Sequence, residues 1–276
     1  MREQEATAKL MVTEAMEFEA AGKQEKAFDI YRAVVKKYPV TTSAAMSQYK
    51  IGAIRKSRGE YVKAFESYQI FVDDYKQSSA FSAAIASQYE IAKASQTGEH
   101  KEKFIGISRK VQRSEVLNMY NKVIENAPYS EYAPQAQFAI GQVLEEDGKG
   151  AEATAAYKKV VASYPKSKLA ADSQFRIAEI GRMAVEGGSR NLANVDSSRR
   201  AYEDLVIGFG DDARKEEARN RVVQFNELEA KKAFDVGRFY EKQKKYKSAA
   251  LYYRRVAQST GTTAAAEAQE LSLIHI

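Results

Sequence analysis

The sequence predicts an all-α protein, a right-handed α-solenoid of about six stacked helical hairpins. The clearest unit runs from Gln137 to Pro165, where apolar or small residues recur at three- and four-residue spacing on both sides of Gly148. This spacing is typical of two amphipathic helices folded back on each other. One hairpin cannot bury both of its apolar faces alone, and similar segments recur along the chain. The composition agrees, because 4 prolines and 44% hydrophobic residues favour a folded helical protein.

A tyrosine in the second helix of each hairpin marks the six repeats. These residues are Tyr31, Tyr68, Tyr120, Tyr157, Tyr202 and Tyr253. Eight residues after the tyrosine, five of the six repeats carry proline or glycine, which end helices. Gly22, Gly59 and Gly148 stand nine residues before their tyrosines, where the hairpins turn. Because large apolar rings at repeat positions pack between helices, we expect the six tyrosines in the core.

The first helices carry a second signature, an aromatic residue three positions before a small one, as in Tyr49-Lys50-Ile51-Gly52. In a stacked array the first helices line the concave surface, so these rings and the polar residues one or two turns along could form a groove. Such a groove suits an extended peptide or a partner helix. Equally, each aromatic ring could pack inside its own hairpin. The candidate groove residues are Tyr49, Lys56, Tyr89, Lys93, Phe138, Gln142, Phe175 and Arg182.

Three departures from regular spacing punctuate the chain. An insertion lies near residues 97–111, a loop covers Glu186 to Asn191, and a long helix is expected near residues 213–244. The repeats group into units 1–3 over residues 1–128 and units 4–6 over residues 129–261. A new helix with Thr263 as N-cap begins within residues 262–270 and is truncated there. Residues 271–276 do not continue the helical pattern and resemble a sequencing or cloning scar.

The net charge of +6 is concentrated late in the chain, since Asp211 to Gly261 holds 13 lysines and arginines against 8 acids, a net of +5. This segment predicts either an interface for an acidic partner or a solvated basic face. Nucleic-acid binding is not expected, because the tyrosines among the basic residues fall on hairpin-packing positions. The candidate partner-interface residues are Arg238, Lys242, Lys245, Lys247, Arg254 and Arg255.

The residues needed for catalysis or metal binding are scarce. The chain has no cysteine and two histidines, His100 and His275, which cannot build a dyad, a triad or a metal cluster. We therefore expect no enzymatic activity and no cofactor. No run of about 18 apolar residues is present and no targeting signal precedes the first helix, so the sequence itself leaves a cytoplasmic location open.

The spacing of the repeats resembles a known family. Gly141, Ala153, Tyr157 and Pro165 follow one another as the signature residues of tetratricopeptide repeats do, with a period of 37 between Tyr31 and Tyr68, slightly above the usual 34 or so. The resemblance implies a superhelix that binds other proteins and has no catalytic role.

The later part of the chain resembles the BamD-type outer-membrane assembly lipoproteins. The similarity lies in Ala218 to Ala250, where a long helix leads to Phe239-Tyr240, a basic turn and an Ala-rich second helix, and in Asn194-Val195-Asp196. It implies a scaffold on the periplasmic face of the outer membrane that holds the β-barrel assembly protein and receives unfolded barrel substrates. The lipidated cysteine of that family is missing, and Tyr252 stands where many members carry arginine.

Two alternatives to this function remain. The first is a generic tetratricopeptide-repeat adaptor, cytoplasmic or periplasmic, without a role in barrel assembly. The second is an enzyme subunit whose catalytic domain lies beyond residue 270.

Overall fold

The computed structural model describes residues 2–98, 101–104, 107–187 and 192–274. In this part of the chain, thirteen helices and two short strands follow one another. They form two compact units, Met1–Lys149 and Gly150–Ile276, which are described separately. The predicted grouping of repeats into residues 1–128 and 129–261 stays a prediction.

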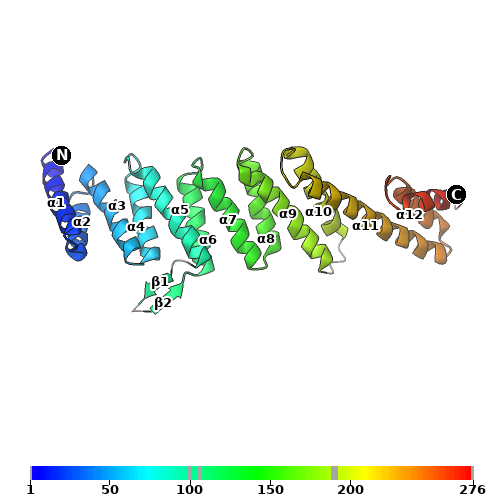
Figure 1. Cartoon of the computed structure of the whole chain (residues 1–276), viewed down its shortest axis with the longest axis horizontal. Helices are drawn as coiled ribbons and strands as arrows, with labels where there is room; N and C mark the ends of the chain where they lie inside the picture. Colours follow the sequence, from blue (N-terminus) through cyan, green and yellow to red (C-terminus); the bar gives the residue numbers. More distant parts are fainter. Residues whose placement is uncertain (1, 99–100, 105–106, 188–191, 275–276) are drawn as a thin grey trace. The chain divides into compact units, whose positions relative to one another are not determined.

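The first unit is a row of antiparallel helices, seen from blue to green in Figure 1. Each helix packs on the next along the chain up to α5, and α6 packs on both α5 and α7. The first helices of neighbouring hairpins also touch, α1 with α3 and α5 with α7. The helices are α1 (Arg2–Ala20), α2 (Gln24–Lys37), α3 (Thr42–Ser57), α4 (Tyr61–Asp74), α5 (Phe81–Thr97), α6 (Arg113–Asn126) and α7 (Tyr132–Glu146).

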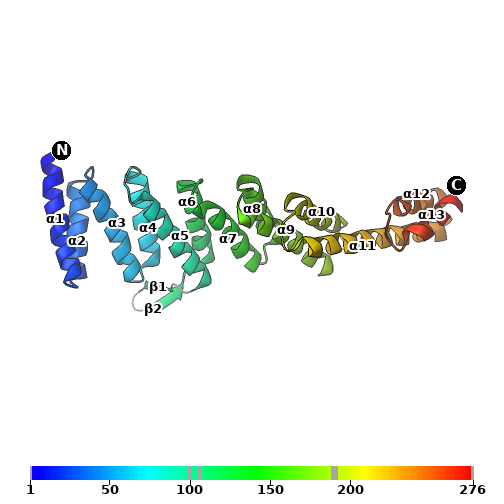
Figure 2. The ribbon, with the colours of Figure 1, turned by 45° about the horizontal axis from the view of Figure 1, so that its top comes forward.

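The second unit contains a helix about twice as long as its neighbours, visible in Figure 2 as the yellow-to-orange element. The helices are α8 (Gly150–Ser163), α9 (Lys168–Glu186), α10 (Leu192–Gly208), α11 (Lys215–Lys242), α12 (Tyr246–Ala257) and α13 (Ala265–Ile274). Helix α11 packs on both α10 and α12, and α12 also packs on α13. The predicted all-α fold of consecutive packed helix pairs is confirmed, including a long helix close to the predicted 213–244.

The second-helix tyrosines are the largest side chains of the core, as predicted. All six have between 0% and 2% of their surface exposed. Their hydroxyl groups still need a partner, and several find one on the first helix: Tyr31 donates to Glu19 at 2.9 Å and Tyr253 donates to Glu241 at 2.6 Å. Burial raises the pKa of Tyr68 to about 12, so this hydroxyl stays neutral at physiological pH.

The hairpin turns require a left-handed backbone at one position. Gly22, Gly59 and Gly148 occupy it with φ between 72° and 75°, which confirms their predicted role. In the α11–α12 hairpin the same position, nine residues before the tyrosine, holds Lys244 with φ 58°. A left-handed conformation costs a non-glycine residue about 1–2 kcal/mol. The turn of the last complete hairpin is therefore strained.

Glycine in the first helix allows the tyrosine ring to reach the backbone. A Cβ atom on Gly52 would stand 2.9 Å from the Tyr68 ring, and one on Gly237 would stand 2.7 Å from the Tyr253 ring. Both distances are shorter than normal carbon contacts of about 3.5–4.0 Å. The small residue of the repeat signature thus sets how closely the two helices of a hairpin approach.

Two glutamines before the first-helix aromatics join the helices of a hairpin through buried hydrogen bonds. The Gln48 amide donates to the carbonyl of Ser67 at 2.8 Å, and the Gln174 amide donates to the carbonyl of Ala201 at 2.9 Å. Each acceptor directly precedes the core tyrosine. Because a buried amide is costly to leave unpaired, these bonds favour one register of the hairpin.

A carboxylate from one first helix also binds the start of the next. Glu5 of α1 accepts hydrogen bonds of 2.7 to 3.2 Å from the backbone and hydroxyl groups of Thr42 and Ser43, at the N-terminus of α3. These N–H groups have no partner within their own helix, and the helix dipole favours a negative charge there. In the second unit, Glu227 of α11 accepts in the same way from Thr263, ahead of α13.

Three sequence predictions need correction or addition. The insertion contains an antiparallel ribbon of β1 (Lys101–Phe104) and β2 (Ile107–Lys110), which the all-helical pattern did not predict. Thr263 is not an N-cap, because α13 begins at Ala265 and the Thr263 hydroxyl donates to Glu227. Helix α13 continues to Ile274, where the pattern predicted an end near residue 270, because Leu271 packs on the core of α11 and α12.

Candidate protein-binding surfaces

The candidate groove residues of the first unit lie on three successive first helices. Tyr49 and Lys56 belong to α3, Tyr89 and Lys93 to α5, and Phe138 and Gln142 to α7. The three aromatic side chains are half-buried, whereas Lys93 and Gln142 are exposed. We call the surface formed by these six residues the first-helix face.

The Tyr49 and Tyr89 rings pack on core tyrosines and are also partly exposed at the surface. The Tyr49 ring stands edge-on to Tyr68 and Phe71, with centroids 5.4 and 5.8 Å away. The Tyr89 ring lies 6.2 Å from Tyr120 and 5.3 Å from Tyr132. Such packing fixes the ring positions. The sequence left open whether these rings face a groove or pack inside their own hairpin. The Tyr49 and Tyr89 rings do some of both, because each packs on a core tyrosine and remains partly exposed.

Ion pairs across neighbouring first helices neutralise part of the first-helix face. Lys56 of α3 pairs with Glu90 of α5 at 2.7 Å, and Lys50 of α3 pairs with Glu19 of α1 at 3.0 Å. Lys56 is therefore already engaged, and a ligand carboxylate would have to compete with Glu90. Lys93, one turn after Tyr89, is the exposed cation of this face.

The two candidate groove residues of the second unit, Phe175 and Arg182, lie on α9. The Phe175 ring stands edge-on to Tyr202 at 6.3 Å and is covered by the Arg214 guanidinium, 4.8 Å from its centre. Asp172 and Asp212 hold that guanidinium at 2.8 and 2.6 Å. A ligand would reach the Phe175 ring only by displacing Arg214, which the sequence did not reveal.

Arg182 is held by acidic neighbours on its own helix. It pairs with Glu179 at 2.7 Å and also with Glu186, one turn further on. The hydrogen bonds that Arg182 donates to Glu179 and Glu186 raise its pKa above the usual range. Desolvation alone would raise the pKa of Glu179, but hydrogen bonds from Arg182 and Tyr202 lower it overall. Arg182 is thus part of an internal charge network.

The candidate partner-interface residues lie along the α11–α12 hairpin: four are at or near its turn, and Arg254 and Arg255 are near the C-terminal end of α12. All six side chains are exposed: Arg238, Lys242, Lys245, Lys247, Arg254 and Arg255. Arg255 approaches Glu229 at 3.7 Å, and Arg238 lies 5.9 Å from the centre of the Phe234 ring. We call this surface the basic hairpin.

Aromatic rings accompany these cations at the surface, contrary to the expectation that the tyrosines pack inside the hairpin. Only Tyr253 is in the core, whereas Tyr246 and Phe239 are 46% and 56% exposed. Tyr240 and Tyr252 stack on each other at 5.6 Å across α11 and α12. The physical reason is helix geometry: successive residues differ by about 100° around the axis, so only one of Tyr252 and Tyr253 can face the core.

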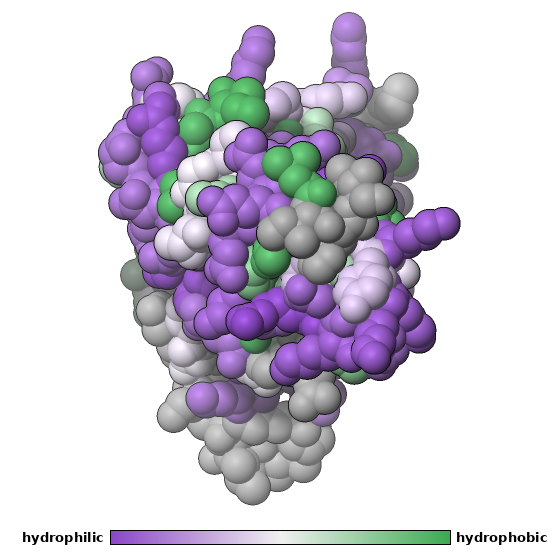
Figure 3. Space-filling view, turned by 90° about the vertical axis from the view of Figure 1, so that its right-hand side faces the viewer, coloured by the Kyte–Doolittle hydropathy of each residue, from purple (hydrophilic) through white to green (hydrophobic). Residues whose placement is uncertain are grey.

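The surface at the α12–α13 end is mostly hydrophilic, with small separate apolar areas, as Figure 3 shows from that side. None of the helices in the described part of the chain is long and apolar enough to cross a membrane. Within the same residues, no group of three or more histidine, cysteine, aspartate or glutamate side chains is arranged to hold a metal ion. His100 and His275 lie outside the described residues.

The packed hairpins, with their recurring glycine, glutamine and tyrosine, define a helical-repeat protein. The tetratricopeptide repeat model matches residues 14–39, 46–78 and 135–167. These three segments are therefore tetratricopeptide repeats, a class of repeat that implies a protein-binding scaffold and is typically not catalytic. The third match includes the Gln137 to Pro165 unit.

Solved structures similar to this chain include tetratricopeptide repeat proteins. One from Parabacteroides merdae is 16% identical, with 98% of this chain and 99% of that chain covered and a TM-score of 0.37. The C-terminal part of a repeat protein from Cytophaga hutchinsonii is 13% identical, with 95% and 87% covered and a TM-score of 0.41. A thermophilic repeat protein from Thermus thermophilus is 14% identical, with 79% and 98% covered and a TM-score of 0.34. A comparison with proteins of curated function gives no match.

Proposed function

We propose that this protein is a non-enzymatic scaffold that binds segments of partner proteins on its first-helix face and docks an acidic partner on its basic hairpin. The observation that carries the proposal is the difference in burial between the aromatic residues of the first and second helices. The second-helix tyrosines are fully buried and build the stack, whereas the rings of Tyr49, Tyr89 and Phe138 are only half-buried. Rigid, partly exposed rings next to polar groups are suited to binding peptides.

We propose further that the pathway is outer-membrane β-barrel assembly, on the periplasmic face of the outer membrane. The resemblance of Ala218 to Ala250 to the BamD-type lipoproteins supports this, because it implies a long helix, a basic turn and an Ala-rich helix, as in α11 and α12. The partners would then be the barrel assembly protein and unfolded barrel substrates. A generic adaptor of another pathway fits the repeats equally well.

Binding of unfolded barrel proteins tests the first-helix face. The full chain is titrated into a fluorescently labelled outer-membrane barrel protein diluted from urea, and the anisotropy gives Kd. Lys93→Glu is the sharpest variant, because Lys93 is exposed and its change leaves the core intact. The matched control is Lys159→Glu on the second helix α8, which is also exposed.

The scaffold proposal expects Kd to rise for Lys93→Glu and to stay unchanged for Lys159→Glu. Equal effects of both variants would mean non-specific attraction and would reject the first-helix face as the binding surface. A second titration uses an unfolded soluble protein. If the unfolded soluble protein bound as tightly as the unfolded barrel protein, the barrel-specific part of the proposal would fail and the generic adaptor would be favoured.

Docking on the basic hairpin is tested separately. The triple change of Lys242, Lys245 and Lys247 to Glu should weaken binding of the barrel assembly protein at low salt, because interfacial charges act mainly on association. The control is the same triple change at Lys158, Lys159 and Lys166, which are exposed in the same unit. An affinity that stays unchanged at low salt would reject the basic hairpin as an interface.

A further inference from the structure

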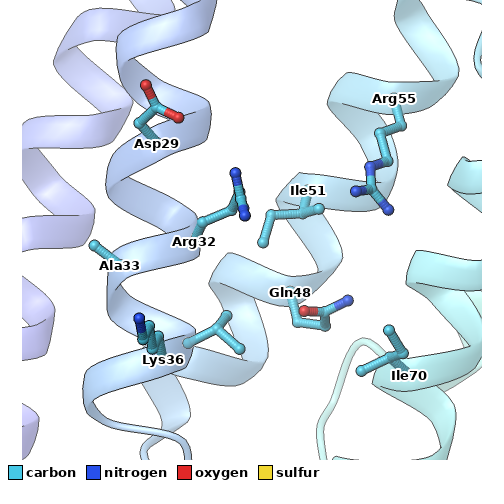
Figure 4. Close-up of a pocket in the computed structure, with 9 residues that line it drawn as sticks. Asp29, Arg32, Ala33, Lys36, Gln48, Ile51, Arg55 and Ile70 are labelled. Atoms are coloured by element: carbon cyan, nitrogen blue, oxygen red, sulfur yellow. The ribbon is translucent and has the colours of Figure 1, made fainter.

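A pocket opens in the first unit between the second helices α2 and α4, with α3 as its floor. It has a volume of about 410 Å³. Figure 4 shows α2 on one side and α4 on the other, and the space between them is bordered by Arg32, Gln48, Ile51 and Ile70. The lining residues are Asp29, Arg32, Ala33, Val35, Lys36, Gln48, Ile51, Arg55 and Ile70.

The charged groups of this pocket are predominantly cationic. Arg32 and Lys36 lie one helical turn apart on α2, and Arg55 projects from α3, against the single acid Asp29. Arg55 is held in place, since it donates to the Ser67 hydroxyl at 2.7 Å. Arg32 and Lys36 form no ion pair with any of the described residues, and both are exposed. Two cations are thus available to a ligand beside one fixed cation.

Apolar side chains form the rest of the pocket. Ile51 is almost fully buried in the floor, whereas Ile70 of α4 is 47% exposed and points toward the pocket in Figure 4. Val35 and Ala33 line the α2 side. An exposed branched side chain facing a concavity gains free energy when an apolar ligand group covers it. The pocket therefore combines a carboxylate-binding rim with an apolar floor.

The corresponding space between the next pair of second helices, α4 and α6, is closed by hydrogen bonds. An open pocket between second helices is therefore not a necessary result of the repeat. Gln69 of α4 holds the repeat position of Arg32, one residue after the core tyrosine. Its amide is joined to Asn126 of α6 at 2.8 and 3.1 Å and to Gln88 of α5 at 2.9 Å. In the first gap, Gln48 bonds instead to the Ser67 carbonyl and Arg32 bridges nothing.

We propose that the pocket between α2 and α4 binds an acidic segment of a partner protein that also carries an apolar side chain. Its carboxylates would meet Arg32 and Lys36, and its apolar side chain would cover Ile51 and Ile70. A nucleic-acid backbone fits less well, because it needs a longer track of cations and has no group for the apolar floor. The pocket uses a different face of α3 from Tyr49 and Lys56, since Ile51 and Tyr49 lie about 160° apart around the helix axis.

The test measures binding of a fluorescein-labelled Glu-Glu-Leu-Leu-Glu-Glu peptide to the full chain by anisotropy. Arg32→Glu combined with Lys36→Glu should weaken binding at least about tenfold, because like charges then face each other. The matched control is Lys158→Glu with Lys159→Glu, since Lys158 occupies the repeat position of Arg32 on α8. Far-UV circular dichroism and thermal unfolding verify that all variants keep the fold.

The apolar floor is tested by Ile70→Ser, with Ile207→Ser as the control, because Ile207 is 82% exposed and lies outside the pocket. Ile70→Ser should weaken the Glu-Leu peptide severalfold but leave an all-glutamate peptide unchanged. Equal loss in the pocket and control variants would overturn the proposal, as would tighter binding of a single-stranded oligonucleotide than of the peptide. The pocket and the first-helix face use different faces of α3. Lys93→Glu should therefore leave peptide binding in the pocket unchanged.

Discussion

Replacing Gly237 with alanine should destabilise the α11–α12 hairpin, although alanine is the better helix former. The new Cβ would stand 2.7, 2.9 and 3.2 Å from three carbons of the Tyr253 ring. That ring has no room to retreat, because it is fully buried, packs on Phe234 at 5.3 Å and donates its hydroxyl to Glu241 at 2.6 Å. Overpacking of this kind costs about 1–3 kcal/mol, and the gain in helix propensity offsets about 1 kcal/mol.

The expected net loss is therefore up to about 2 kcal/mol, concentrated in the last hairpin. Hydrogen exchange of the α12 amides reports it best, because neighbouring repeats can open separately. Urea unfolding followed by circular dichroism gives the global effect. Gly208→Ala is the control, since no atom lies within 4 Å of a Cβ there. If the α12 amides exchanged as slowly in Gly237→Ala as in Gly208→Ala, the close approach of the Tyr253 ring to the α11 backbone would not limit the stability of this hairpin.

Three further predictions concern turns, buried amides and pH. Lys244→Gly should stabilise the protein by about 0.5–1 kcal/mol in urea unfolding, because glycine accepts φ 58° without strain; a loss of stability would contradict this. Asn126→Ala should cost about 1–3 kcal/mol, because it leaves the buried Gln88 amide group with fewer partners, whereas an unchanged unfolding midpoint would mean that water replaces it. Desolvation would raise the pKa of Glu5, but the hydrogen bonds from Ser43 and Thr42 lower it overall, so its contribution is present above the unfolded glutamate pKa and lost on acidification. Wild type should thus exceed Glu5→Gln in Tm at neutral pH, and the difference should shrink as the pH falls through the lowered pKa of folded-state Glu5; a constant difference would exclude this linkage.

The repeat core was predictable because its determinants are local in the sequence. A buried tyrosine recurs beside small residues and turn glycines, and these set the helix pair whatever surrounds it. The turn at Lys244 was less visible, since lysine there gives no left-handed signal. The β1–β2 ribbon was missed because a short, isolated pair of strands lacks a strong periodic pattern.

The candidate surfaces were only partly predictable. The sequence located the basic hairpin, because its cations cluster along the chain. It did not reveal that Arg214 covers Phe175, since the two are 39 positions apart and meet only through the packing of α9 with the turn before α11. The pocket between α2 and α4 was missed for the same reason, although the Arg32 and Lys36 pair at one-turn spacing was visible on the second helix.

The sequence by itself determined the all-helical repeat, the burial of the six tyrosines and the long helix α11, because periodicity and turn residues act over a few positions. Only the tertiary structure decided which surface groups remain available. Lys56 is engaged by Glu90 and Gln69 by Asn126, whereas Arg32 and Lys36 are left for a ligand. The reason is physical. A polar side chain is available to a ligand only if neighbouring helices place no hydrogen-bond or ion-pair partner within about 3–4 Å of it, and those helices come from other repeats.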